Sequence, residues 1–369
     1  MIKGSSASRR SSWGALVADA ERVEKGDLAH FRALTSHRQR DVQTANGHAL
    51  SYSAVVRALL VVNPQATATT AAGRDVLAHA LASEVKLDVI ETNHRGHAAE
   101  AAGQAVAEGY DLVVAHGGDG TVNEVVNGMR RGGGTVAGPM LGVVPGGSAN
   151  VFAGALGLPR DPVEATYRLL QAVEHGTSRR VGLGKVASTG ASADNDRWFT
   201  FNAGVGWDAD VVADVERQRA KGREASPALY ARTAFTSYVG QRRHKPALTV
   251  QIPDEEPITD VRLAFVSNTD PWTYLGDKAI RLNPSTSFDN DLGLFALRNL
   301  GLPTVLRYVG HLLVRDGNPK GGNLLRRDDV SYVRVTSKEP VNLQVDGDLL
   351  GDCTEVEFTS VPEALTVAV

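Results

Sequence analysis

One segment shows the architecture of this chain most directly: Leu112-Val113-Val114-Ala115-His116-Gly117-Gly118-Asp119-Gly120-Thr121-Val122-Asn123-Glu124-Val125-Val126-Asn127-Gly128. Its apolar start predicts a buried strand, the glycines predict a turn, and the valines that follow recur at helical spacing. Such a turn binds anions well, because free backbone N–H groups and the helix dipole point at the ligand. Asp119 inside the turn indicates a cation beside the phosphates. The segment therefore predicts a nucleotide site.

The same residues also allow a simpler interpretation, a plain connection between a strand and a helix. Thr121 and Glu124 have the spacing of a capping box, in which the two side chains satisfy N–H groups at a helix start. A capping box would explain Thr121 and Glu124, but it would not explain three glycines around a carboxylate. Glu124 can therefore be a cap or part of the site.

Composition narrows the class of protein. The 369 residues are 42% hydrophobic and 22% charged, which is ordinary for a globular protein and suggests two domains plus an extension. The net charge of −3 argues against a nucleic-acid-binding protein. The one cysteine, Cys353, excludes an internal disulfide framework, and no apolar run reaches the ~18 residues that span a bilayer. We expect a cytoplasmic protein whose membrane contact is peripheral.

The pattern of apolar runs divides the chain into three parts. Residues 1–54 form an extension that we expect to be partly disordered or helical, and its role is not readable. Residues 55–180 alternate strands and helices, which predicts an α/β domain with a mostly parallel sheet and ligand loops at the carboxyl ends of its strands. The expected strands are 59–62, 87–90, 112–115 and 141–144, and the expected helices are about 70–83, 97–108 and 162–175.

Residues 181–369 have a different texture and predict a β-rich, antiparallel second domain, whose C-terminal segment can return to the first. Turns separate short β-forming runs at 197–205, 247–252, 260–267, 293–298, 331–336, 341–345, 354–359 and 364–369. The small, polar loop 188–196 is expected to be mobile.

Four loops that follow apolar runs carry a resemblance to a known family. They are Asn63-Pro64, Thr92 to Ala98 with Gly96-His97-Ala98, Gly117 to Asn123, and Pro145-Gly146-Gly147-Ser148-Ala149-Asn150. In this order they resemble the catalytic domain of the diacylglycerol kinase family, which includes sphingosine kinases and bacterial lipid kinases. The glycine segment alone is less specific, because NAD kinases share it. The resemblance covers about Val55 to the C-terminus and implies an NAD kinase/diacylglycerol kinase-like α/β fold for the first domain.

The resemblance implies an ATP site in the first domain. The residues that would contact ATP are Asn63, Thr92, Gly117, Gly118, Asp119, Gly120, Thr121, Val122, Asn123 and Ser148. Ser148 stands where the family more often has threonine, and it keeps the hydroxyl. Val151 stands where many members have aspartate.

It also implies catalytic and metal residues in the second domain. Asp346-Gly347-Asp348 resembles the family's Asp-Gly-Glu, whose last acid is the proton acceptor, and Asp348 is one methylene shorter. Without the resemblance, Asp-Gly between β runs predicts a hairpin turn. Asp348, Asp346 and Asp119 are the candidate catalytic residues. Residues 283–291 resemble an accessory Mg²⁺ loop, with Asp289 as the side-chain ligand and Thr286 and Asp291 contributing backbone carbonyls. Asp291 in place of Asp289 as the acidic ligand stays an open alternative.

These observations favour an ATP- and Mg²⁺-dependent lipid kinase that phosphorylates a lipid hydroxyl, with diacylglycerol as the leading acceptor and phosphatidic acid as its product. Phosphoryl transfer needs held phosphates, a bridging cation and a carboxylate near the acceptor hydroxyl. Two alternatives stay open, an NAD kinase-like small-molecule kinase and a catalytically inactive nucleotide- or lipid-binding protein. Sphingosine, ceramide and phosphatidylglycerol are alternative acceptors, and a homodimer is an open possibility.

A lipid kinase of this kind must take its substrate at a membrane surface. Residues 302–314 are apolar over much of a predicted helix, with Arg307, Arg315, Lys320, Arg326 and Arg327 nearby. This pattern suits an interfacial helix with basic anchors, and equally a core helix with a solvated end.

Overall fold

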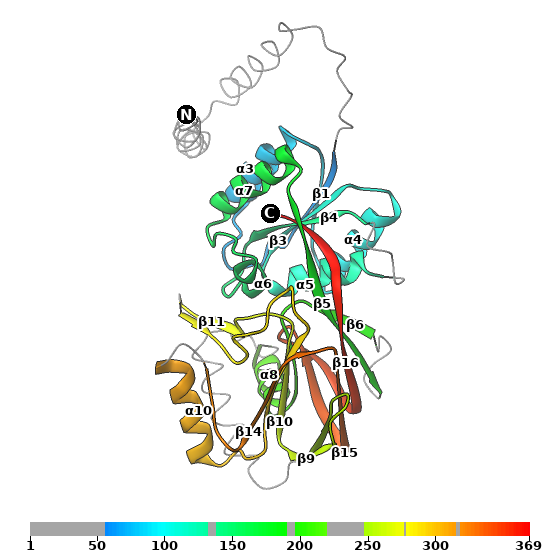
Figure 1. Cartoon of the computed structure of the whole chain (residues 1–369). Coiled ribbons are helices and arrows are strands. Elements are labelled where there is room, and N and C mark those ends of the chain that lie inside the picture. The colour runs from blue at the N-terminus through cyan, green and yellow to red at the C-terminus, as the bar shows by residue number, and fades with distance from the viewer. Residues whose placement is uncertain (1–55, 132–137, 190–195, 220–246, 277, 315–317) are drawn as a thin grey trace, which may run out of the picture.

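The structure, a computed structural model, describes residues 56–131, 138–189, 196–219, 247–276, 278–314 and 318–369. The predicted extension 1–54, most of the predicted loop 188–196 and Arg315 lie outside the described residues. In Figure 1 the α/β part is above and the β-rich part is below.

The first part is built on a parallel sheet with the strand order β4-β3-β1-β2. Its strands are β1 (Arg57–Val62), β2 (Lys86–Glu91), β3 (Leu112–Gly117) and β4 (Met140–Pro145). Its helices are α3 (Ala71–Ala82), α4 (His97–Ala107), α5 (Asp119–Met129), α6 (Val151–Ala155) and α7 (Pro162–His175).

Helices cover both faces of this sheet, and alternation along the strands assigns the side chains to two cores. In β3, Val113 and Ala115 pack with α4 and α5, whereas Leu112 and Val114 pack with α3 and α7. Figure 1 shows α3 beside α7 and α4 on the other side of the strands. Apart from Arg57 at the start of β1 and His116 near the end of β3, the side chains of these two central strands are apolar, because neither face reaches water.

The second part is a largely antiparallel array joined to the same sheet. Its strands are β5 (Ser178–Thr189), β6 (Asp196–Phe199), β7 (Asn202–Gly206), β8 (Leu248–Gln251), β9 (Ile258–Val261), β10 (Leu263–Ser267), β11 (Thr273–Leu275), β12 (Lys278–Ile280), β13 (Leu292–Leu297), β14 (Leu324–Val330), β15 (Tyr332–Val345) and β16 (Asp348–Ala368). Helices α8 (Trp207–Arg219) and α10 (Leu302–Val314) accompany them.

Two long strands connect the halves. β16 pairs with β15 near its start, with β5 along most of its length, and with β4 in parallel at Val367 and Leu141. Parallel strands in the first half and antiparallel strands in the second confirm the predicted fold class. The predicted boundary near residue 180 falls inside β5, and the division into domains stays a prediction.

One predicted strand is wrong in a way that matters for the site. The run 197–205 is interrupted between β6 and β7, at Thr200 and Phe201. The backbone turns there because the N–H groups of Thr200 and Phe201 donate to the carboxylate of Asp346. A side chain from the far end of the chain therefore sets the break, which local patterning could not show.

Candidate active site

Three loops meet at the carboxyl ends of β1, β3 and β4. Asn63 N donates to His116 O at 3.0 Å, and Gly146 N donates to Gly117 O at 2.8 Å. Ala68 N donates to Gly146 O at 2.8 Å. The loops after the three strands are thus tied to one another by their backbones, as expected at this edge of a parallel sheet.

The two glycine loops touch backbone to backbone. A Cβ atom on Gly147 would lie 2.6 Å from Gly118 Cα, and one on Gly146 would lie 3.0 Å from Gly117 Cα. Glycine is therefore required at these positions by close approach. Gly118 precedes α5 and gives the helix no side-chain cap, so the helix start presents backbone donors and its positive dipole end. This cradle fits a phosphate group.

Asp119 stands at the first position of α5 and is half-buried. Its Oδ1 accepts a hydrogen bond from Phe152 N, at 3.1 Å, at the start of α6. The pKa of Asp119 is raised to about 6, because burial and the charge on Asp346 together outweigh the backbone N–H groups of residues 150–152, which lower it. Asp119 therefore ties the start of α5 to the start of α6.

Asp346 is almost completely buried and accepts five hydrogen bonds. Its Oδ2 accepts from Thr200 N and Thr200 Oγ1, both at 2.7 Å, and from Asn123 Nδ2 at 2.7 Å. Its Oδ1 accepts from Phe201 N and Asn202 N, both at 3.0 Å. Burial raises the pKa of Asp346, and its donors oppose the rise. With both oxygens engaged, this carboxylate holds the β6–β7 turn against α5.

Asp348 differs from Asp346 although only Gly347 separates them. Its side chain is 23% exposed and forms ion pairs with Arg95 at 3.3 Å and Arg197 at 3.1 Å. Arg197 also donates to Asn123 Oδ1 at 2.8 Å. Two arginines from different parts of the chain thus hold Asp348 beside α5.

The remaining predicted ATP contacts divide into two groups. Thr92 and Ser148 keep accessible surface at the loops, and Gly120 has open space where a Cβ would be. Asn63 Nδ2 donates to the buried Thr121 hydroxyl at 3.1 Å, which closes one side of the cradle. Val122 and Asn123 point inward.

Val122 is a core residue, and its N–H donates to Gly118 O within the helix. Asn123 is fully buried, and its amide contacts Asp346 and Arg197. Both side chains therefore serve packing between elements.

The capping-box interpretation of Thr121 and Glu124 is wrong. The helix begins at Asp119, so Thr121 already lies inside it. Glu124 Oε1 accepts from Gly96 N at 2.9 Å, so it fixes the loop before α4 instead of the start of its own helix.

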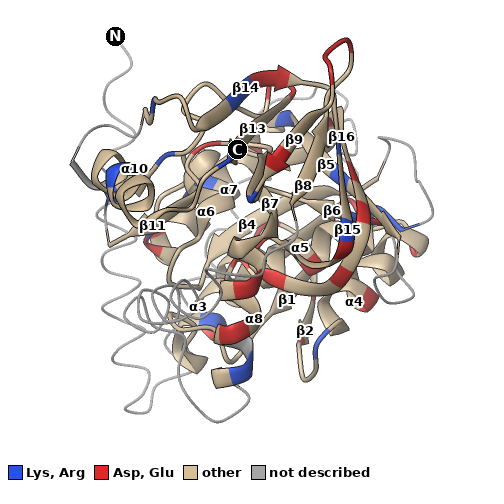
Figure 2. Ribbon diagram, turned by 90° about the horizontal axis from the view of Figure 1, so that it is seen from below, with Lys and Arg blue, Asp and Glu red and all other residues tan. Residues whose placement is uncertain are grey.

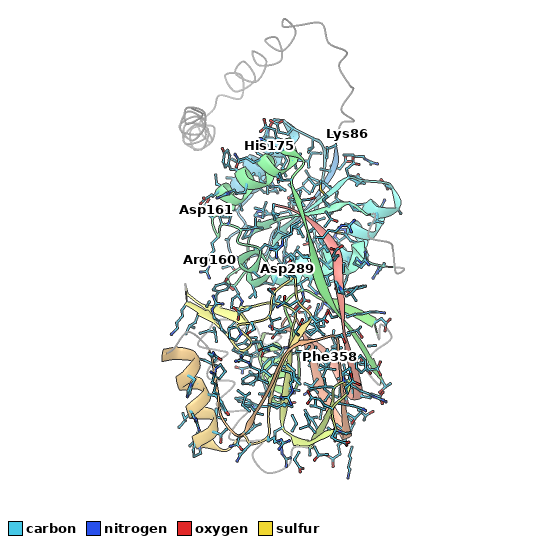
Figure 3. The ribbon with its side chains drawn as sticks, viewed as in Figure 1. Lys86, Arg160, Asp161, His175, Asp289 and Phe358 are labelled. Carbon is cyan, nitrogen blue, oxygen red and sulfur yellow. The ribbon has the colours of Figure 1, made fainter. Side chains whose placement is uncertain are left out.

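The residues of the predicted accessory Mg²⁺ loop contact three different parts of the protein. Asp289 lies where the two halves meet (Figure 3) and accepts from Arg179 at 2.7 Å. Thr286 is buried, with its hydroxyl facing Gly293, where a Cβ would lie 2.1 Å away. The backbone N–H of Asp291 donates to Asp329 at 2.9 Å. Within the described ranges no three His, Cys, Asp or Glu side chains are arranged to hold a metal.

The structure places a further polar cluster near Asp119, which no sequence motif marks. Asp270 is buried and pairs with Arg281, and its Oδ1 has no hydrogen-bond partner in the structure. Burial raises the pKa of Asp270 to about 6, and Arg281 opposes the rise.

Tyr274 extends this cluster to α6. Its hydroxyl faces Gly154, and the Arg160 guanidinium lies 4.3 Å from its ring centroid. Burial raises the pKa of Tyr274, and the charges of Asp270 and Asp119 raise it further. No motif marks these residues, because their proximity depends on how the β11–β12 hairpin packs.

Comparisons with known proteins point to one family. Residues 57–186 match the family model described as the diacylglycerol kinase catalytic domain. The chain is 37% identical to a diacylglycerol kinase of Bacillus subtilis over 34% of this chain, and the match spans only 36% of that relative. It is 29% identical to a Pseudomonas aeruginosa protein named probable lipid kinase YegS-like, over 76% of this chain and 84% of the relative.

A solved structure shares the fold over most of the chain. It is described as a diacylglycerol kinase from Bacillus anthracis, with 20% identity and a TM-score of 0.61, and the match covers 85% of this chain and 96% of that one. At this identity the likeness establishes the fold alone.

Proposed function

We propose that this protein is a lipid kinase, because residues 57–186 match the family model of the diacylglycerol kinase catalytic domain. It transfers the γ-phosphate of ATP to a lipid hydroxyl, with Mg²⁺ as the accompanying cation. Diacylglycerol is the proposed acceptor and phosphatidic acid the proposed product, because relatives that match 34% and 29% of the chain are named diacylglycerol kinases.

One juxtaposition carries the proposal: a glycine cradle from the first half lies against carboxylates from the second. The cradle is formed where Gly118 and Gly147 touch, at the start of α5. Asn123 in α5 then contacts Asp346 and, through Arg197, Asp348. Phosphoryl transfer needs this arrangement, since it brings the phosphate donor and the acceptor hydroxyl to one place.

Asp119 is the residue that fits Mg²⁺. Mg²⁺ in kinases takes one or two carboxylates, and phosphate oxygens and water complete its shell. A half-buried carboxylate at the helix start that holds the phosphates meets this requirement. The cation would neutralise charge on the phosphates when bound.

Asp348 is the proposed proton acceptor. The acceptor hydroxyl oxygen forms a bond to the γ-phosphorus, the bond from that phosphorus to the bridging oxygen of ADP breaks, and the hydroxyl proton passes to Asp348. Of the two acids in the Asp346-Gly347-Asp348 turn, Asp348 has accessible surface, whereas Asp346 is almost completely buried and accepts five hydrogen bonds. Arg95 and Arg197 hold its carboxylate in place, which is positioning of the kind that general bases need.

The test is transfer of ³²P from γ-labelled ATP to a panel of lipids in mixed micelles, with NAD in a parallel reaction. Labelled phosphatidic acid from diacylglycerol, dependent on Mg²⁺, is the expected result. Label on another lipid would change the acceptor and keep the lipid kinase. Label on NAD, or no label at all with ATP still bound, would overturn the proposal in favour of a small-molecule kinase or an inactive nucleotide-binding protein.

A further inference from the structure

Helix α10 has an apolar outer stripe. Leu302 is 39% exposed, Leu306 61% and Val309 43%. Positions i, i+4 and i+7 lie on one face of a helix, so the three side chains form a continuous line. The described residues expose six large hydrophobic side chains, and three of them are in this stripe.

The opposite face of α10 already holds the helix on the protein. Tyr308 is 4% exposed and packs edge to face on Phe295 of β13, with ring centroids 6.3 Å apart. The surrounding core includes Leu263 and Phe265 of β10. Because the inner face anchors the helix, the exposed stripe has no packing role within the described part of the chain.

The charge on α10 itself is positive, since Arg307 is its one charged residue apart from His311. No acidic residue occurs between Leu292 and Val314, although the whole chain has a net charge of −3. Arg307 is exposed on α10 and its guanidinium donates to the carbonyl of the exposed Lys320 at 3.5 Å. Figure 2 shows basic colour and no acidic colour on α10. An apolar line flanked by Arg and Lys complements an anionic lipid surface.

Helix α10 lies on the same side of the molecule as the β11–β12 hairpin, whose Tyr274 contacts Gly154 of α6. Figures 1 and 2 both place β11 and α10 on that side, and Leu275 at the end of β11 is 49% exposed. The core under α10 also contains Trp272, whose carbonyl accepts from Asn202 Nδ2 at 3.2 Å. Asn202 in turn donates to Asp346.

We propose that α10 docks the protein on an anionic bilayer, with Leu302, Leu306 and Val309 among the acyl chains and Arg307 and Lys320 at the lipid phosphates. No helix among the described residues could cross a membrane. The biological meaning of this surface rests on the proposed lipid kinase, since docking would bring the hairpin side of the site to the bilayer that holds the acceptor.

The binding test uses the full chain and co-sedimentation with vesicles of phosphatidylcholine, alone or mixed with phosphatidylglycerol. We expect binding that requires phosphatidylglycerol and weakens with salt. Leu306→Glu and Arg307→Gln should each lower the partition coefficient, the former by about tenfold or more. Val163→Glu is the matched control, because Val163 is 37% exposed on α7, away from α10, and its variant should bind like wild type.

A thermal unfolding scan checks that both exposed sites tolerate the change. Wild-type partitioning by Leu306→Glu, or no binding of the unaltered protein to anionic vesicles, would overturn the proposal. A dimer in solution that Leu306→Glu converts to a monomer would also overturn it, because a second copy would then cover the stripe.

An activity comparison separates docking from catalysis. Leu306→Glu should phosphorylate a short-chain, monomeric diacylglycerol at the wild-type rate and lose at least about tenfold on diacylglycerol embedded in anionic vesicles. Equal loss on both acceptors would contradict docking. The protein could also bind vesicles through Leu306 and yet phosphorylate neither acceptor. That result would support the docking surface and contradict the proposed lipid kinase.

Discussion

Asn123 Nδ2 donates to Asp346 Oδ2 at 2.7 Å, which joins two residues 223 positions apart. Asn123 belongs to the helix that begins at the glycine cradle, and Asp346 precedes the strand that returns to the first half. Asp346 also fixes the β6–β7 turn through three backbone N–H groups. The placement of the glycine cradle relative to the β6–β7 turn therefore depends on this carboxylate.

Asp346→Asn should destabilise the protein by about 2 to 4 kcal/mol, because an amide NH₂ would face buried donors and leave them unpaired. The backbone is not the cause of the loss, since Asp346 has a φ of 47° and Asn adopts this region readily. Urea unfolding of variant and wild type measures the difference. Full stability with lost activity would instead make Asp346 a direct participant in the reaction.

Asp119→Asn should lower turnover at least about 10²-fold, because the carboxylate charge beside the phosphate cradle is lost. The amide oxygen can still accept from Phe152 N, so the unfolding temperature should not fall. Steady-state kinetics on the identified acceptor checks this result. Wild-type turnover in this variant would remove Asp119 from the active site.

Asp348→Asn should cost about 10² to 10⁴ in rate if Asp348 receives the acceptor proton. Asp352→Asn is the matched control, because Asp352 is an exposed acid on the same strand. The rate with saturating ATP and acceptor is the measurement. A loss of less than about threefold, far below that range, would return the role to Asp119 or Asp346.

Gly147→Ala should lower kcat/KM for ATP by about 10- to 100-fold, because the new methyl group would lie 2.6 Å from Gly118 Cα and force the glycine loops apart. Gly322→Ala is the control, since a Cβ there meets no atom within 4 Å. ATP titrations of both variants test the prediction. Unchanged ATP kinetics in Gly147→Ala would show that the loop contact does not shape the nucleotide site.

Asp270 gives a prediction for pH and stability. Its pKa is raised from 3.8 to about 6, so the folded state favours the protonated form. Below about pH 4 Asp270 is protonated in both the folded and the unfolded state, so it does not lower the free energy of unfolding. As the pH rises towards 6 the unfolded state loses its proton first, and the free energy of unfolding falls. Above that range Asp270 lowers the free energy of unfolding by about 3 kcal/mol in total.

Asp270→Asn should therefore stabilise the protein at pH 7.5 by about 1 to 3 kcal/mol and have little effect at pH 4. Thermal or urea unfolding at both pH values checks the pattern. A variant that is less stable than wild type at pH 7.5 would show that the ion pair with Arg281 outweighs the burial of the charge.

Much of the first half could be predicted from local sequence. Periodicity placed its strands and helices within a few residues, and the glycines with Asp119 indicated the cradle, because both depend on near neighbours in the chain. The second half was predicted less completely. The run 197–205 was given as one strand, although Asp346 breaks it, and no local pattern marked β5, which spans the predicted domain boundary.

The sequence by itself determined the fold class, the glycine turn before α5 and the acids that are candidates for catalysis. The tertiary structure decided how those acids differ. Asp346 is buried under five donors, Asp348 is held by Arg95 and Arg197, and Asp119 remains half-buried at the cradle. Periodicity and turn chemistry act over a few residues, but the environment of a carboxylate is set by strands and loops that reach it from more than a hundred positions away.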